Sequence, residues 1–316
     1  MNYFEIIPSE LNNIIISYIS YDEFIILLRT FSLPYINWST IHYYHFGEYK
    51  HMLLQEYSSK LGIESLINKL RLNYTIDQLI DLKELHLYDN RLSEVPPEIE
   101  NLTNLQKLYL NNNQLTHVPK EIGNLTNLQV LNLASNKLAV APPEIGNLKN
   151  LKELYLTNNQ LTQLPPEVGN LTNLQRLNLS GNQLIQVPSE ISNLTNLQIL
   201  GLAFNQFMRV PPEIGALTRL QVLDLMNNKL TQVPPEIGNL TNLQKLYLTY
   251  NQLVRVPAEI GNLTNLQVLG LSHNQLTEVP SEIGNLTNLQ EIWLNNNFNI
   301  QVPENIKKLP MLQIIK

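Results

Sequence analysis

The sequence predicts an α/β solenoid, a stack of short coils whose strands form one parallel, concave sheet in a horseshoe, preceded by a small all-helical module. Two observations predict the solenoid: one pattern returns at a constant spacing without insertion or deletion, and leucines alternate with variable residues in every copy. A third observation predicts the helical module, because the segment 1–75 lacks the pattern. A single short coil cannot bury its apolar face alone, so repeated coils stack and share a core.

The repeats begin at Leu82, return at Leu105 and Leu128, and keep this spacing as far as Leu289, which gives ten full copies. Each copy approximates L-x-x-L-x-L-x-x-N-x-L-x-x-V-P-P-E-I-G-N-L-T-N. Side chains alternate between the two faces of a strand, so Leu108 points inward while Lys107 and Tyr109 point outward. We therefore divide the chain into a helical module and cap over 1–75 and a repeat domain over 76–316, with partial repeats at both ends.

The proline-rich half of each copy predicts the outer turn of the coil. In the copy that contains Val233, Pro235 suits the first position of a short helical turn because its missing N–H would have no partner there. Glu236 lies at the positive end of that turn. A glutamate returns at this position in most other copies, and the charge at the start of the turn explains it better than a binding site for a basic partner does. We expect Gly238 to supply backbone freedom where the turn ends.

Asparagine returns at one fixed position of each copy, where the chain leaves the strand and turns inward. Its amide can donate to and accept from backbone groups of adjacent coils that water does not reach. We predict a structural ladder of Asn90, Asn113, Asn136, Asn159, Asn182, Asn205, Asn228, Asn251 and Asn274.

With its L-x-x-L-x-L-x-x-N-x-L signature, the region from residue 82 onward resembles the leucine-rich repeat family. The length of the copies and their P-P-E-I-G-N-L half resemble the intracellular, Ras-group repeats of that family. The resemblance implies a horseshoe with a parallel concave sheet, in the manner of repeat proteins that bind other proteins.

Both ends of the array depart from the pattern. Leu72, Ile76 and Leu79 match the outer half of a coil, but no strand half precedes them. Near the C-terminus a leucine is replaced by Asn299, and we expect Phe298 or Ile300 to fill the gap.

The N-terminal segment IPSELNNIIISYISYDEFIILLRTFS, followed by a tryptophan, resembles the F-box. F-box modules bind the Skp1 adaptor of cullin ubiquitin ligases through an apolar face. The resemblance implies that Pro8, Leu11, Ile15 and Leu28 contact Skp1. The alternative is that these helices only cap the first coil. The combination of F-box and repeats also resembles proteins of giant viruses.

Composition excludes several classes of function. The chain has no cysteine, and therefore neither disulfides nor a thiolate nucleophile. Its net charge of −6 argues against nucleic-acid binding. No apolar stretch is long enough to span a membrane, and no secretory leader is visible. His42 and His45 lack further ligands for a metal. We expect no enzyme, metal or cofactor, and a cytoplasmic location, in the host cell if the protein is viral.

The outward strand positions vary most between copies and carry aromatic and charged residues, as protein-binding faces do. The alternative is that these residues are only good strand formers. As contacts for a protein target on the concave face we predict His86, Lys107, Tyr109, Tyr155, Arg176, Phe204, Asp224, Lys245, Tyr247, Tyr250 and Trp293. Two functions follow: a substrate adaptor for a Skp1/cullin ligase, or a recognition scaffold without a ligase.

Overall fold

The computed structural model describes the backbone of residues 47–315 and the side chains from Ser59 onward. The chain divides into two compact units, Met1–Leu61 and Gly62–Lys316. Helix α3 (Gly47–Leu70) crosses this division, and α4 (Ile76–Ile80) follows it. The predicted Skp1 contacts Pro8, Leu11, Ile15 and Leu28 lie outside the described residues.

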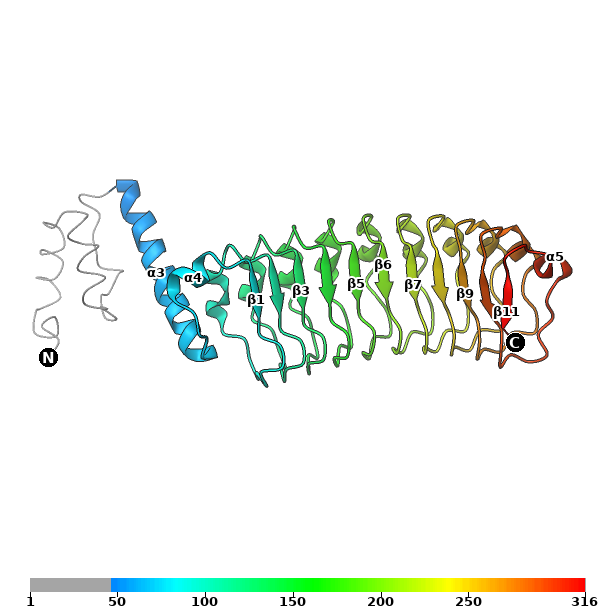
Figure 1. Cartoon of the computed structure of the whole chain (residues 1–316), viewed down its shortest axis with the longest axis horizontal. Helices are drawn as coiled ribbons and strands as arrows, with labels where there is room; N and C mark the ends of the chain where they lie inside the picture. The colour runs from blue at the N-terminus through cyan, green and yellow to red at the C-terminus, as the bar shows by residue number, and fades with distance from the viewer. Residues whose placement is uncertain (1–46, 316) are drawn as a thin grey trace, which may run out of the picture. The chain divides into compact units, whose positions relative to one another are not determined.

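The second unit is built on one sheet of eleven parallel strands that follow one another in chain order (Figure 1). Each strand pairs with the next in a register offset by one repeat, as in Leu108↔Leu131. This confirms the predicted solenoid. The strands are β1 (Glu84–His86), β2 (Lys107–Tyr109), β3 (Val130–Asn132), β4 (Glu153–Tyr155), β5 (Arg176–Asn178), β6 (Ile199–Gly201), β7 (Val222–Asp224), β8 (Lys245–Tyr247), β9 (Val268–Gly270), β10 (Glu291–Trp293) and β11 (Gln313–Ile315).

Short 3₁₀ helices form the outer half of the coils. A proline precedes each of them, and in five coils a second proline is the first helical residue, as expected for Pro235. They are η3 (Pro97–Asn101), η4 (Lys120–Asn124), η5 (Pro143–Asn147), η6 (Pro166–Asn170), η7 (Ser189–Asn193), η8 (Pro212–Ala216), η9 (Pro235–Asn239), η10 (Ala258–Asn262) and η11 (Ser281–Asn285). Their isoleucines and the strand leucines are fully buried in one continuous core.

The glycine of the outer turn has a different purpose from the one predicted. Gly181 is the only described glycine with a positive φ, so Gly238 needs no unusual backbone freedom. A Cβ on Gly238 would instead lie 2.6 Å from the backbone oxygen of Glu259 in the next coil. The glycine therefore allows neighbouring coils to approach closely. Ser192 takes the same place in its own coil, where its hydroxyl donates to the Ser189 carbonyl.

The ends of the array are closed by helices. Ile63 and Leu66 of helix α3 are fully buried in the repeat core. Leu79 of α4 joins them, in agreement with the half-coil read from the sequence. At the other end α5 (Glu304–Lys307) replaces a 3₁₀ turn. Ile300 packs against the core, whereas Phe298 is 69% exposed and does not fill the gap.

Candidate functional site

The asparagine ladder fixes the edge at which each coil leaves the sheet. Asn182 is typical: its Nδ2 donates to the carbonyls of Leu156 and Leu179, each at 2.9 Å, and its Oδ1 accepts the Leu161 N–H at 3.0 Å. Two of these three partners belong to the preceding coil. The side chains from Asn113 to Asn274 are buried and repeat this arrangement. Asn90 is the exception, because it is exposed and donates only to the Tyr88 carbonyl.

A second asparagine ladder on the outer side of the coils was not predicted. Asn173 donates from Nδ2 to the Lys149 carbonyl at 2.8 Å, and seven other coils repeat this bond to the preceding coil. In one coil Arg219 replaces the asparagine and donates to the Asn196 side chain instead. The last asparagine of the N-L-T-N sequence is the signal that could have revealed this ladder.

The two ladders and the buried leucines hold the strands rigidly, so the outward side chains form one surface. We call this surface, made by the first and third residues of β1 to β10, the concave face. It carries nine of the eleven predicted contacts: His86, Lys107, Tyr109, Tyr155, Arg176, Asp224, Lys245, Tyr247 and Trp293. Phe204 and Tyr250 lie instead in the turns that follow β6 and β8.

The first coils bring four of these positions together. The ring of His86 stacks on Tyr109 with centroids 4.8 Å apart, and Lys107 pairs with Glu84 at 2.7 Å. The hydrogen bond from Lys107 lowers the pKa of the Glu84 carboxyl. Both charged groups are well exposed to solvent, so this pair organises the surface and contributes little stability.

In the central coils the phenol of Tyr155 donates to the Glu153 carboxylate at 2.5 Å. Burial is the main cause that raises the pKa of Tyr155, Glu153 adds to it, and the nearby Arg176 opposes it. This phenol therefore stays protonated at neutral pH and presents a half-buried ring beside an exposed guanidinium.

The last coils carry an aromatic pair over a glycine. The rings of Tyr247 and Trp293 lie on β8 and β10 with centroids 5.7 Å apart, and Gly270 of β9 lies between them. A Cβ on Gly270 would meet both rings at 3.3–3.4 Å, so glycine permits the rings to converge. The indole N–H of Trp293 donates to Glu291 at 2.8 Å, which fixes the orientation of the ring. The exposed Lys245 shares β8 with Tyr247.

Asp224 lies beside this pair, in register with Tyr247 on the neighbouring strand. Burial raises the pKa of the Asp224 carboxyl, and the only effect opposing it is the hydrogen bond from the Met226 N–H at 3.0 Å. No basic side chain among residues 59–315 pairs with it. Its charge adds to the effect of burial in raising the pKa of the Tyr247 phenol.

In the turn after each of β1 to β10, the residue directly before the repeated asparagine has a positive φ. Most coils place Asn, Asp, Ser or Gly here, which suits the left-handed conformation. Phe204 (φ 53°) and Tyr250 (φ 57°) are bulky exceptions. Each costs about 1–2 kcal/mol relative to a favoured residue. Neither gains burial in return, because they are 53% and 50% exposed.

Four exposed residues in the same two coils were not predicted as contacts. Met208 and Val254 stand where four other coils have threonine, and Arg209 and Arg255 follow them. Alignment of the copies column by column would have found them, because they depart from the internal consensus.

The described residues hold no group of three His, Asp or Glu side chains that could bind a metal ion. In the same part of the chain, no helix has both the length and the apolar character needed to cross a bilayer.

Comparison with known proteins agrees with this architecture. The family model of the leucine-rich repeat region matches residues 61–159, 143–251 and 236–316. The chain is similar to a leucine-rich repeat protein of Leptospira interrogans, with 37% identity over 77% of this chain and 74% of that one and a TM-score of 0.58. No curated protein sequence matches significantly.

Two further solved structures are also similar. The plant peptide hormone receptor RGFR1, in complex with RGF2, is 36% identical over 74% of this chain, with a TM-score of 0.67. PEPR1, in the PEPR1–AtPEP1 structure, is 34% identical over 70%, with a TM-score of 0.63. The matches span only 39% and 32% of those two chains. The family model covers far more than half of the sequence, and the chain therefore belongs to the leucine-rich repeat family.

Proposed function

We propose that this protein is a non-enzymatic recognition protein that binds a protein target on its concave face. The rigid sheet contributes preorganised side chains, so little conformational freedom is lost when a target binds. The Tyr and Trp rings supply the kind of anchor that dominates binding energy at protein interfaces.

The charge of Asp224 is the observation that carries this proposal. Asn132 and Asn178 occupy the same position in earlier coils, and their side-chain oxygens accept the same backbone hydrogen bond, at 3.1 and 3.0 Å. A neutral asparagine amide therefore makes the same backbone hydrogen bond as the Asp224 carboxylate, and the fold does not require a charge at this position. A half-buried carboxylate without a basic partner is costly for the folded chain, and a bound partner that supplies a cation would offset this cost.

The surroundings of Asp224 suit an arginine or lysine side chain of the target. A cation above the faces of Tyr247 and Trp293 is attracted by the ring quadrupoles. The Asp224 carboxylate lies on the strand next to Tyr247, and Glu291 lies beside Trp293. RGFR1, a similar chain, is a plant peptide hormone receptor that was solved in complex with RGF2, which supports a polypeptide target here.

The finer form of the proposal makes the protein a substrate adaptor of a cytoplasmic Skp1/cullin ubiquitin ligase. Its support is the F-box-like sequence of the N-terminal segment, including Pro8, Leu11, Ile15 and Leu28. The mechanism is proximity, because holding a target near a ligase raises its effective concentration. The alternative is a recognition scaffold in which the N-terminal helices only cap the repeats, and the concave face has the same role in both.

The test of the concave face is affinity capture with the full chain, followed by binding measurements on the captured protein. Asp224→Asn and the double variant Tyr155→Ala/Tyr247→Ala should each weaken binding at least about tenfold. Glu236→Gln removes one negative charge from the outer turn and serves as the matched control, with unchanged affinity. If the control and the concave variants behave alike, the concave face is not the binding surface.

The adaptor form is tested separately with purified Skp1. Binding that is lost in Leu11→Asp but retained in Asp224→Asn supports it. If the wild-type chain does not bind Skp1 at micromolar concentration, the scaffold alternative holds.

A further inference from the structure

Two alternate coils share a set of residues that the others lack. Phe204, Met208 and Arg209 in one coil correspond to Tyr250, Val254 and Arg255 two coils later. The coil between them has Asn227, Thr231 and Gln232 at these positions, residue types that recur there in other copies. The three departures occur together twice, at equivalent positions of segments that run from the end of a strand toward the outer turn. We call the exposed residues of segments 203–212, 226–235 and 249–258 the lateral surface.

The fold does not explain the apolar members of this surface. Met208 and Val254 are 63% and 57% exposed; threonine takes their place in four other coils, and Ile185, 62% exposed, takes it in one. Phe204 and Tyr250 are exposed in a left-handed conformation that the asparagine of the intervening coil adopts more easily. Backbone strain of this kind is found where a functional surface requires the residue. The Tyr250 ring is further held by stacking on His273, with centroids 3.9 Å apart.

The segments of the lateral surface carry only positive charges, and the outer-turn glutamates Glu213, Glu236 and Glu259 follow directly after them. Its three segments contain Arg209, Lys229 and Arg255 and no acidic residue, although the whole chain has a net charge of −6. Lys229 reaches the Gln206 side chain at 3.5 Å, and among residues 59–315 neither arginine side chain has a hydrogen bond or ion pair. Three cations on consecutive coils are thus available to carboxylates from outside the chain.

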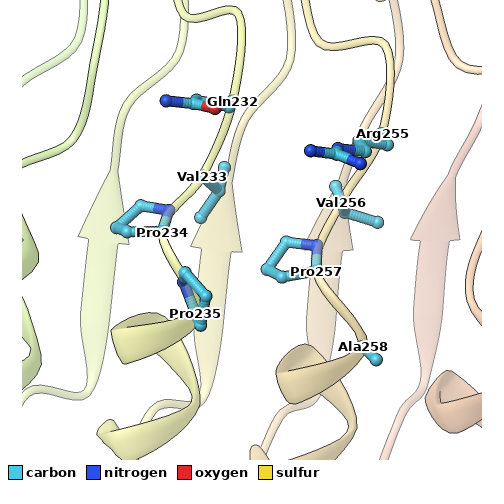
Figure 2. A pocket seen from close by; sticks show the side chains of 8 residues that line it. All are labelled: Gln232, Val233, Pro234, Pro235, Arg255, Val256, Pro257 and Ala258. Atoms are coloured by element: carbon cyan, nitrogen blue, oxygen red, sulfur yellow. The ribbon is translucent and has the colours of Figure 1, made fainter.

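A cavity of about 450 Å³ opens on the lateral surface between the coil of Gln232–Pro235 and the coil of Arg255–Ala258. Figure 2 shows Gln232 and Arg255 at one end and Pro235 and Ala258 at the other, with Pro234 and Pro257 between. The cavity therefore has walls of proline and valine and a guanidinium at one end. This arrangement suits an apolar side chain that is followed by a carboxylate.

We propose that the lateral surface is a second binding site, which takes an acidic segment of a partner protein with an aliphatic side chain between its carboxylates. The carboxylates pair with Arg209 and Arg255, the aliphatic side chain enters the cavity, and Phe204, Met208, Tyr250 and Val254 cover the apolar part. The exposed apolar residues distinguish this surface from a track for a phosphate backbone, which needs cations alone.

The spacing of the coils sets the spacing of the acidic residues. Neighbouring strands lie about 4.8 Å apart, so equivalent positions two coils apart are separated by about 10 Å. A peptide in the polyproline II conformation advances about 3.1 Å per residue with three residues per turn, so side chains three positions apart lie on the same side of the peptide and cover about the same distance. The expected ligand therefore carries acidic residues three positions apart, with aliphatic residues between them.

The probe is the fluorescein-labelled peptide Gly-Glu-Leu-Leu-Glu-Gly, measured by fluorescence anisotropy against the full chain. We expect binding in the range of about 10–100 μM, and at least about tenfold weaker binding when both glutamates are replaced by glutamine. Arg209→Glu/Arg255→Glu should abolish binding. Lys120→Glu/Lys137→Glu makes the same change of charge on other coils and should leave it intact.

A second variant separates the contribution of Phe204 and Tyr250 to peptide binding from their contribution to stability. Phe204→Asn/Tyr250→Asn installs the residue of the intervening coil, so it should fold at least as well as the wild type while binding the peptide at least about tenfold more weakly. Asp224→Asn should not alter peptide binding, which keeps this site distinguishable from the concave face.

Four outcomes would overturn the proposal. Two are no binding of the peptide at about 1 mM and unchanged binding in Arg209→Glu/Arg255→Glu. Tighter binding of a single-stranded oligonucleotide than of the peptide would assign the surface to nucleic acid. Self-association that is lost in the same arginine variant would assign it to a second copy of the chain.

Discussion

Replacement of Asn182 by alanine tests how the coils are held together. Asn182 is 8% exposed, and its amide is the partner of the Leu161 N–H and of the Leu156 and Leu179 carbonyls. Each buried group that loses its partner costs about 1–3 kcal/mol. Water that enters the vacated space recovers part of this cost, so we expect the free energy of unfolding to fall by about 3–5 kcal/mol.

Asn90→Ala is the matched control, because it removes the same side chain from the same position of the repeat. Asn90 is exposed, and its amide donates only to the Tyr88 carbonyl at 3.1 Å. Its removal should cost less than about 1 kcal/mol. Urea unfolding followed by circular dichroism measures both variants. Equal losses of unfolding free energy in the two variants would refute the reasoning, because the cost would then come from removing any asparagine at this repeat position and not from breaking buried hydrogen bonds.

Three further predictions concern stability. Asp224→Asn should stabilise the chain at pH 7. Burial raises the pKa of this carboxyl above its unfolded value, so the stability of the wild type falls as the pH rises from the unfolded pKa through the folded pKa. Urea midpoints measured across this pH range should show the fall in the wild type and not in the variant. Gly238→Ala should cost about 1–3 kcal/mol, since its Cβ would lie 2.6 Å from the Glu259 oxygen, and an unchanged melting temperature would contradict this. Phe204→Asn should raise the free energy of unfolding by about 1 kcal/mol by relieving the left-handed strain, whereas a loss of stability in chemical denaturation would show that the ring supports the fold.

The contacts between side chains could only partly be anticipated. The sequence places His86 and Tyr109 in equivalent positions of adjacent copies, and they stack. It does not show that Tyr247 and Trp293, two copies apart, meet over Gly270, because that depends on the absence of a side chain on the strand between them. The meaning of Asp224 also required the structure, since its burial and its lack of a basic partner are properties of the surroundings.

The repeat predicted the sheet, its register and the inward leucines because copies of constant length leave one way to stack the coils with their apolar faces together. Only the structure shows that Gly238 is needed because the next coil approaches it closely. It also shows that Asn90 is exposed and that Phe204 has a left-handed backbone. Local patterns specify what one coil does by itself, whereas close approach, burial and unpaired charge arise only when coils lie side by side.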